Sequence, residues 1–296
     1  MICAHLIMLL PLTIFAQAGN SGLAFLKMGV GGRGAALASS FVADADGAVA
    51  AYWNPANLAG SSNELFFSHT EWLEDIRSEF IAVKFNARGL AVGASLQFQS
   101  VDGIMLRSRP SAEPDAIATS HDVAMGLSVA GNLNQAIEVG ASLKYVGERV
   151  VNFAVNGFAF DLGIRYKVAQ IPGLKMSGSV HNIGDLSGFR DDSMQLPRLF
   201  RLGLAYRPGL TFNTGDVQLF AAARRVTDGS TSFSTGLELK FKRSIFVRGG
   251  ISTGVESQRF AGGFGIQKGR YSLDYSYTPF NFDLGTTHRY SMAILL

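Results

Sequence analysis

The stretch SFSTGLELKFK, residues 232–242, alternates between two sets of side chains along its whole length. Phe233 and Phe241 belong to a largely apolar set, whereas Glu238 and Lys240 belong to a polar set. Because successive side chains of a β-strand point to opposite faces, the stretch predicts a strand with one apolar and one charged face. It is long enough for a tilted strand to cross a bilayer, which takes about 9 to 11 residues.

The same alternation recurs in residues 90–99, 158–167 and 200–207. The full set of strands predicted in this way covers residues 64–70, 77–86, 89–100, 119–131, 134–148, 151–167, 173–183, 196–207, 215–227, 231–242, 244–255, 258–268, 270–278 and 286–296. These fourteen segments give the even number that a single-chain bacterial barrel requires. We therefore predict an all-β fold, a transmembrane antiparallel β-barrel over residues 64–296. Residues 102–109 either form another strand or extend the third.

The composition fits a barrel and excludes several other classes of protein. Of 296 residues 47% are hydrophobic, yet no stretch after residue 20 approaches the roughly 18 consecutive apolar residues of a membrane helix. Lys and Arg are spread singly and the net charge is +3, which excludes nucleic acid as a partner. Cys3 is the only cysteine, so an intrachain disulfide and a cysteine-based zinc site are excluded. The spacing of the histidines predicts no metal site, and we expect no cofactor.

Residues 1–18, MICAHLIMLLPLTIFAQA, have an apolar core from Leu6 to Phe15 followed by the small-x-small pattern AQA. This combination predicts a signal peptide that is removed near residue 19. The segment departs from the usual pattern because no Lys or Arg precedes the apolar core. The alternative interpretation is a membrane anchor, for which the apolar run is short.

The lengths of the predicted connections indicate how the barrel is oriented. Connections after even-numbered strands are short turns such as residues 87–88 and 269, whereas those after odd-numbered strands include residues 101–118 and 184–195. Outer-membrane barrels have short periplasmic turns and longer external loops, so both termini are predicted to be periplasmic. The last strand resembles the terminal insertion signal of such barrels, although that signal usually ends in an aromatic residue rather than Leu296.

Residues 19–63 lack the alternation and are rich in Gly, Ala, Ser and Asp. Three motifs stand out in them: FLKMGVGGRG at residues 25–34, SFVADAD at 40–46 and YWNPANLA at 52–59. Together these motifs resemble the opening of the PorV/PorQ family of outer-membrane barrels, which are akin to FadL-type transporters of long-chain fatty acids. Asn57 stands where the family motif Trp-Asn-Pro-Ala-Gly-Leu has its glycine.

The resemblance implies that residues 19–63 form a hatch inside the lumen. The bottom-up argument agrees, because a barrel of about fourteen strands leaves a lumen too wide for wall side chains alone to fill. The expected hatch residues are Gly29, Gly31, Arg33, Gly34, Asp44, Asp46, Trp53, Asn54 and Pro55. We expect the glycines to permit close backbone approach, and Trp53, Asn54 and Pro55 to form a rigid turn that anchors the hatch at the first strand.

The polar face of the predicted strands, which must line the lumen, carries charges of both signs. These residues are Glu138, Lys144, Asp161, Arg165, Arg201, Arg224, Glu238, Lys240, Arg248 and Asp274. Mixed charges suit a wall that holds a polar plug through paired contacts. The alternative is that these side chains are solvated and have no specific partner.

Two glycine patterns are compatible with enzyme motifs but lack the context those motifs need. Residues 29–34 fit the dinucleotide pattern G-x-G-x-x-G, which is meaningful only between a strand and a helix. Residues 250–254 fit G-x-S-x-G around Ser252, yet a nucleophile elbow needs a sharp strand-to-helix turn and these residues lie in a predicted strand. We therefore predict that the protein is not an enzyme.

Three functions remain open, favoured in the following order. The resemblance implies a component of type IX secretion that receives or shuttles exported cargo, with secretion subunits or cargo as partners. The second is FadL-like transport of a hydrophobic small molecule, for which Phe41, Phe66, Phe67 and Phe80 would supply apolar surroundings. The third, an outer-membrane enzyme that modifies lipids, rests on Ser252 alone. All three place the protein among the lipids of the bacterial outer membrane.

Overall fold

The structure is a computed structural model. It describes residues 22–60, 62–73, 76–151, 153–187, 195–212, 215–227, 229, 231–242, 244–254 and 258–296. The predicted signal peptide, residues 1–18, lies outside the described residues. None of the helices in the described ranges is both long and apolar enough to cross a membrane.

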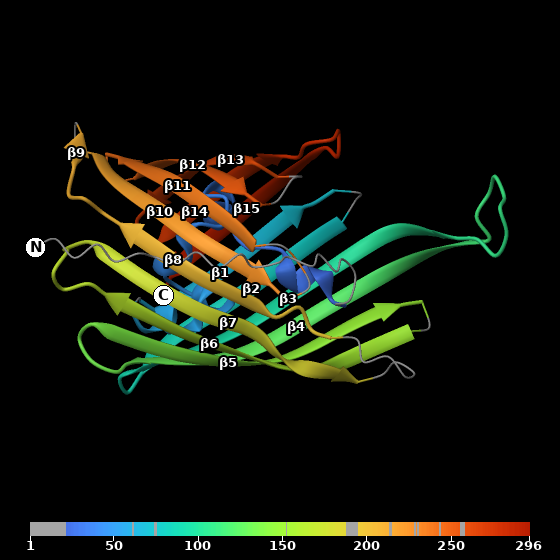
Figure 1. Cartoon of the computed structure of the whole chain (residues 1–296), viewed down its shortest axis with the longest axis horizontal. Helices are drawn as coiled ribbons and strands as arrows, with labels where there is room; N and C mark the ends of the chain where they lie inside the picture. The colour runs from blue at the N-terminus through green and yellow to red at the C-terminus, as the bar shows by residue number, and fades with distance from the viewer. Residues whose placement is uncertain are drawn as a thin grey trace, which may run out of the picture.

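The wall of the molecule is a single antiparallel sheet closed on itself (Figure 1). Within the described residues fourteen long strands pair in chain order, and β1 pairs with β15 to close the barrel. Their bounds are β1 (Glu64–Glu71), β2 (Ile76–Ala87), β3 (Leu90–Leu106), β4 (Ala116–Asn132), β5 (Ile137–Val150), β6 (Phe153–Lys167), β7 (Leu174–Ser187), β8 (Leu199–Tyr206), β10 (Gly215–Val226), β11 (Thr231–Phe241), β12 (Ile245–Thr253), β13 (Phe260–Lys268), β14 (Tyr271–Pro279) and β15 (Thr286–Leu295). The closed antiparallel barrel of fourteen strands predicted from the alternation is confirmed.

The strands differ from the prediction at two places. Residues 102–106 extend β3 rather than forming another strand, because pairing with β4 resumes beyond a register shift between Val101 and Ile104. The predicted loop 101–118 therefore shrinks to residues 107–115, and the β3–β4 hairpin projects beyond the other strands (Figure 1). The alternation did not predict β9 (Thr211–Phe212), which pairs only with the start of β10.

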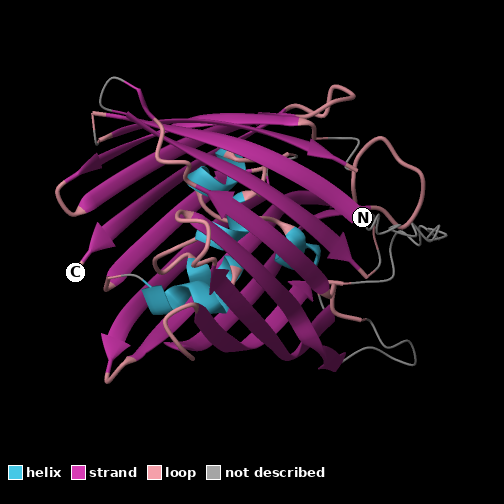
Figure 2. Cartoon of the chain, turned by 60° about the vertical axis from the view of Figure 1, so that its left-hand side comes forward, coloured by secondary structure: helices cyan, strands magenta, loops and turns pink. Residues whose placement is uncertain are grey.

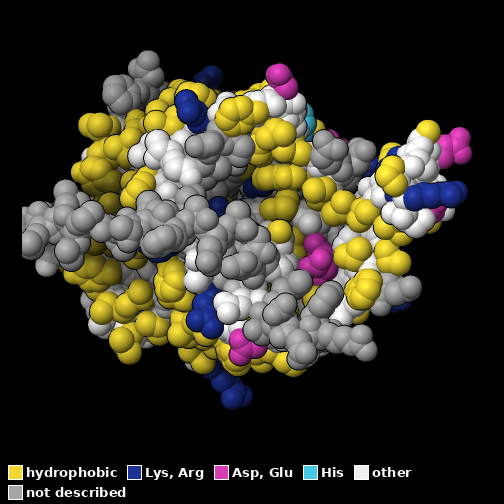
Figure 3. All heavy atoms as spheres, turned by 45° about the vertical axis from the view of Figure 1, so that its right-hand side comes forward, with side chains coloured by type: hydrophobic (Ala, Val, Ile, Leu, Met, Phe, Trp, Pro, Cys, Tyr) yellow, Lys and Arg dark blue, Asp and Glu magenta, His cyan; other side chains and the backbone are white. Residues whose placement is uncertain are grey.

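Burial alternates along the strands as the sequence predicts. On β8, for example, Leu202 is 65% exposed and faces outward, whereas its neighbour Arg201 is 4% exposed and faces the lumen. Hydrophobic side chains dominate the described part of the surface in Figure 3, and charged ones are few there. The outer surface is therefore apolar in the way a bilayer-facing wall requires.

Residues 22–60, called the N-terminal segment here, fold into short helices enclosed by the wall (Figure 2). The helices are η1 (Ala24–Lys27), α1 (Gly32–Ala36), η2 (Phe41–Asp44), α2 (Ala50–Trp53) and η3 (Pro55–Gly60). Phe41 and Trp53 pack edge to face at 5.1 Å, and both join a buried cluster with the wall residues Phe66 and Phe80. Apolar burial thus fixes the segment against the inside of the sheet.

Glycines of the wall lie where the backbone of this segment comes closest. A Cβ added at Gly140 of β5 would lie 2.5 Å from the carbonyl of Pro55. Likewise, Gly163 of β6 lies against Asn54, and Gly250 of β12 lies against the backbone of Leu37. At Gly140 and Gly250 an added methyl group would displace main chain, whereas at Gly163 it would displace the side chain of Asn54.

Candidate functional site

The interior of the barrel holds two cavities on opposite sides of the N-terminal segment. One cavity, of about 400 Å³, lies at the end with tight turns such as residues 88–89, and we call it the turn-side cavity. The other, of about 240 Å³, lies at the end with long connections such as residues 107–115, and we call it the loop-side cavity. The segment therefore divides the lumen into two chemically different spaces.

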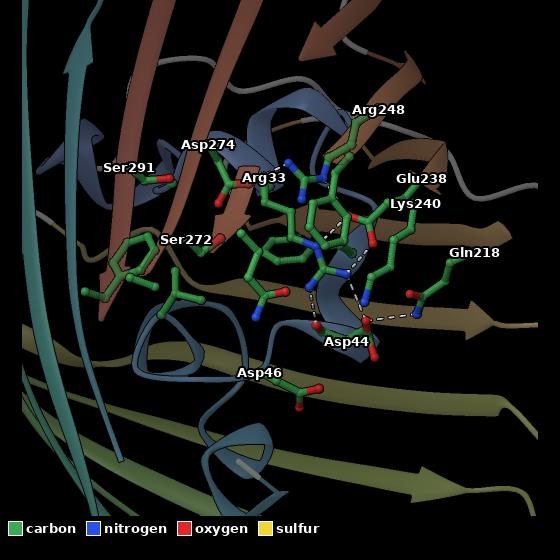
Figure 4. Close-up of a pocket in the computed structure, with 18 of the residues that line it drawn as sticks. Arg33, Asp44, Asp46, Gln218, Glu238, Lys240, Arg248, Ser272, Asp274 and Ser291 are labelled. Atoms are coloured by element: carbon green, nitrogen blue, oxygen red, sulfur yellow. Dashed lines mark hydrogen bonds and ion pairs between the residues drawn. The ribbon is translucent and has the colours of Figure 1, made fainter. Parts of the chain in front are cut away.

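Arg33 connects the segment to the wall of the turn-side cavity. Its Nε lies 2.9 Å from Glu238 Oε2 on β11, and its Nη2 lies 3.0 Å from Asp44 Oδ2 within the segment (Figure 4). Arg248 continues the chain of charges, with its Nε 2.5 Å from Glu238 Oε2 and its Nη1 2.6 Å from Asp274 Oδ1. The opposite charges alternate, so each carboxylate is balanced by at least one guanidinium.

Asp44 is a second junction in the same cavity. Lys175 Nζ of β7 lies 2.5 Å from its Oδ1, and Gln218 Nε2 of β10 donates to its Oδ2 at 2.9 Å. Burial by itself would raise the pKa of Asp44, but the charges of Arg33 and Lys175 outweigh burial and hold that pKa well below its ordinary range. Burial likewise opposes the charge of Arg33, yet Glu238 and Asp44 raise the pKa of its guanidinium above the ordinary value.

Asp46 contacts β6 and β7. Arg165 of β6, which is fully buried, forms ion pairs with Asp46 on the segment and with Glu138 on the wall. Lys167 Nζ adds a contact of 2.6 Å to Glu138 Oε1. Lys175 Nζ of β7 lies 3.4 Å from Asp46 Oδ2, so Asp44 and Asp46 share this lysine, and each has a further partner on a different strand.

A buried polar cluster lies where β7 bulges away from β6. Asp161 Oδ2 lies 3.1 Å from His181 Nδ1, and His181 Nε2 lies 2.8 Å from Ser179 Oγ. This order of groups resembles a nucleophilic triad. However, Arg201 Nη1 lies 3.2 Å from His181 Nε2, and the adjoining space of about 20 Å³ has room for little more than one water. The cluster stabilises the bulge and offers no place for a substrate.

Aromatic and cationic side chains line the loop-side cavity. Arg201 donates to the carbonyl of Tyr52 at 3.0 Å, and its guanidinium lies 5.0 Å from the centre of the Trp53 ring. Arg289 lies 5.1 Å from the centre of the Trp72 ring, which packs edge to face against Phe280 at 5.3 Å. The space is therefore amphipathic, in contrast to the charge-paired turn-side cavity.

The predicted anchor residues Asn54 and Pro55 contact the wall at β6 and β5 rather than at the first strand. Trp53 Nε1 donates to the carbonyl of Val30 at 3.1 Å, and Asn54 Nδ2 donates to the carbonyl of Ile164 on β6 at 3.2 Å. Of the predicted glycines, the N–H of Gly31 donates to Ser68 Oγ of β1 at 3.1 Å. Gly29 and Gly34 both lie against the Trp53 ring.

The predicted luminal charges lie on the inner face, but they do not form one site. Lys144 Nζ pairs with Asp161 at 2.8 Å, far along the wall from the network of Arg33. Arg224 donates to the carbonyl of Lys27 at 2.7 Å, and Lys240 Nζ lies 5.4 Å from the centre of the Phe246 ring.

The residues of these sites that were not predicted include Lys175, Gln218 and Arg289. Their strands were predicted, and the same alternation that places Arg201 inside also places them inside. The signal for Arg289 was available, because the alternation places it on the face of the last strand opposite to that of Tyr290 and Met292. The alternation does not predict which luminal charges contact one another across the lumen.

The two enzyme-like patterns have no catalytic geometry. Residues 29–34 end in the five-residue helix α1, which does not follow a strand. Ser252 lies within β12, where its N–H donates to the carbonyl of Arg259 at 2.8 Å, so no nucleophile elbow forms. Across the described ranges, no three His, Cys, Asp or Glu side chains are grouped as metal ligands would be.

The fold is similar to those of several solved structures. The CymD monoaromatic hydrocarbon channel aligns with a TM-score of 0.62 and 12% identity over 90% of this chain and 98% of that one. A FadL homologue from Pseudomonas aeruginosa aligns with a TM-score of 0.59 and 11% identity over 89% and 97%. The Pseudomonas putida toluene transporter TodX gives 0.53 and 11% over 82% and 91%.

No family model matches the sequence, and no curated protein sequence matches it. At such low identity the structural likeness concerns the fold alone. The chain has a FadL-like outer-membrane β-barrel fold.

Proposed function

We propose that the protein is a channel for small hydrophobic molecules in the bacterial outer membrane. The observation that carries this proposal is the loop-side cavity, an aromatic-lined space enclosed by the wall and the N-terminal segment. Proteins of similar fold include a monoaromatic hydrocarbon channel and a toluene transporter, which supports this class of cargo. In this proposal residues 1–18 direct export, residues 19–63 are the hatch, and residues 64–296 form the barrel.

Uptake by intact cells tests the proposal. The full-length protein is produced in a bacterium that lacks its own hydrophobic-compound channels, and uptake of radiolabelled toluene is measured at low concentration. We expect uptake well above that of cells without the protein. Ala222→Trp should reduce it, because Ala222 lines the loop-side cavity and a large ring would fill the space.

The matched control is Ala221→Trp, one position along the same strand on the outward face. It should leave uptake unchanged. An assembled, heat-modifiable barrel that gives no uptake above the background would contradict the proposal, as would equal uptake by the two variants.

A role in type IX secretion rests on the sequence resemblance of residues 25–34, 40–46 and 52–59 to the PorV/PorQ family. The proteins of similar fold named above are a channel, a transporter and a FadL homologue, and they lend secretion no support. It remains a second prediction. Co-purification of the protein with exported cargo that shares a carboxy-terminal domain would favour secretion over transport.

A further inference from the structure

The two cavities differ sharply in their balance of charge. The turn-side cavity is lined by five basic and six acidic residues, and its arginines Arg33 and Arg248 are paired with carboxylates. The loop-side cavity is lined by four basic residues, Lys27, Arg201, Arg224 and Arg289, and none of the described residues that line it is Asp or Glu. Because Arg201 and Arg289 both line this space and no carboxylate is among its described lining, the space favours an anion.

Arg289 and Arg201 carry the argument, because both are buried. They are 5% and 4% exposed, and no carboxylate of the described residues lies within ion-pair distance of either guanidinium. The Nε atoms of both arginines are buried without a hydrogen-bond partner among the described residues. Burying an unpaired charge is costly, so a protein that keeps two such arginines at one cavity gains from a compensating ligand.

A purely structural role accounts for Arg201 but not for Arg289. Arg201 donates to the carbonyls of Tyr52 and Trp53 and so holds the N-terminal segment. Arg289 makes no such hydrogen bond within the described part of the chain. Its contact is with the face of the Trp72 ring, which leaves the edge of the guanidinium available for an acceptor.

The rest of the lining limits the shape of the ligand. Trp53, Trp72 and Phe280 present ring surfaces to the cavity. The volume of about 240 Å³ lies below the range of about 300 to 1,000 Å³ that is usual for drug-sized ligands. A single aromatic ring with a short anionic group fits both limits, whereas an extended chain exceeds the space.

We propose that the loop-side cavity selects compact aromatic carboxylates, with Arg289 binding the carboxylate and the rings of Trp53 and Trp72 contacting the aromatic body. This inference rests on the proposed channel function and narrows its cargo from hydrophobic molecules in general to aromatic anions. Arg201 adds a second positive charge on the same cavity.

Tryptophan fluorescence reports directly on ligand binding in this cavity, because Trp53 and Trp72 are the only two tryptophans of the chain and both line the space. The full-length protein in detergent is titrated with sodium benzoate and with toluene, its neutral analogue of similar size. Tryptophan fluorescence and calorimetry follow binding. We expect saturable binding of benzoate at least tenfold tighter than that of toluene.

Variants at Arg289 then separate charge from packing. Arg289→Gln should weaken benzoate binding at least tenfold and leave toluene binding unchanged, and Arg289→Lys should retain part of the affinity. The matched control is Arg207→Gln, which removes an arginine that lines the turn-side cavity, and it should bind benzoate as the wild type does.

Equal affinity for benzoate and toluene in the wild type would overturn the inference, even if every variant failed to fold. Equal loss in Arg289→Gln and Arg207→Gln would also overturn it. Either result is compatible with toluene uptake by cells, so the inference can fail while the proposed function stands. Failure of the function itself would appear as no uptake at all.

Discussion

Arg33 of the N-terminal segment and Glu238 of β11 form an ion pair of 2.9 Å between Nε and Oε2. The pair joins segments that lie 205 positions apart in the chain. Glu238 also receives Arg248, and Arg33 also contacts Asp44, so the pair is the centre of a network. Five predictions follow from the way the segment is held inside the wall.

Removing the guanidinium of Arg33 should loosen the segment without opening the sheet. We expect Arg33→Gln to lower the free energy of unfolding by about 2 kcal/mol, because a largely buried carboxylate loses one of its partners. The effect is measured as the urea concentration at which half of the protein migrates as the unfolded rather than the compact form in an unheated detergent gel. Glu113→Gln, on the exposed β3–β4 connection, should have no effect, and an equal shift in both variants would contradict the prediction.

The contribution of Asp44 should depend on pH with a definite sign. Because its pKa in the folded protein is held below the ordinary value near 4, its stabilising effect is complete above about pH 4 and is lost as pH falls through the lower folded pKa. The difference in unfolding midpoint between wild type and Asp44→Asn should be constant from pH 7 to about pH 5 and shrink below about pH 4. A difference that grows on acidification would refute this.

The wall glycines that face the segment should not accept a methyl group. Gly140→Ala should cost about 1 to 3 kcal/mol, because the new Cβ would lie 2.5 Å from the main chain of Pro55. Gly249→Ala is the matched control, since a Cβ there meets nothing within 4 Å. Thermal unfolding of the two variants, run side by side, measures the effect. Equal midpoints would mean that the segment does not lie against β5.

The outer face should reject charge in the middle of a strand. Leu202→Arg should destabilise the protein by about 2 to 4 kcal/mol, because it places a charge near the bilayer midplane. Leu202→Phe tests the same site without a charge and should be nearly neutral. Folding into lipid vesicles at a series of urea concentrations gives both values, and a mild effect of arginine would place this face away from lipid.

Deletion of residues 24–52 should leave an assembled barrel whose lumen is open to ions. The deleted part includes three of the five helices of the segment, all of α2 except Trp53, and many of the side chains that separate the two cavities. We expect single-channel conductance in planar bilayers to rise well above that of the intact protein. If a deletion variant that still runs as a heat-modifiable barrel conducts no better, the segment does not obstruct the lumen.

Alternation was sufficient to predict the wall because each side chain there meets either lipid or the lumen. In β8, for example, Phe200 and Leu202 could be separated from Arg201 by sequence alone, and their exposure agrees. Bulges are harder to predict from the alternation. The register shift that turns both His181 and Asn182 inward adds one residue to β7, so the alternation of inward and outward side chains changes parity between Val180 and Ile183.

The contacts inside the lumen were predicted as residue types but not as partners. Asp44 and Asp46 are separated by one residue and share Lys175, yet Asp44 also contacts Gln218 of β10 whereas Asp46 contacts Arg165 of β6. That division depends on how the backbone turns after η2, where Ala45 has a φ of −76° and a ψ of 65°. Period-two reasoning carries no information about such a turn.

The N-terminal segment runs the full length of the barrel. The N–H of Leu23 donates to Glu148 near the long connections, whereas Asn63 precedes β1 and bonds to Leu296 beside the tight turns. A segment that runs through the lumen in this way cannot leave it by rotating as a rigid body about its connection to β1. To leave the lumen at the end with the tight turns, the residues near Leu23 would have to move along its whole length. The ion pairs that hold the segment would have to break first. In the proposed channel, small cargo would therefore pass beside the segment while the segment stays in the lumen.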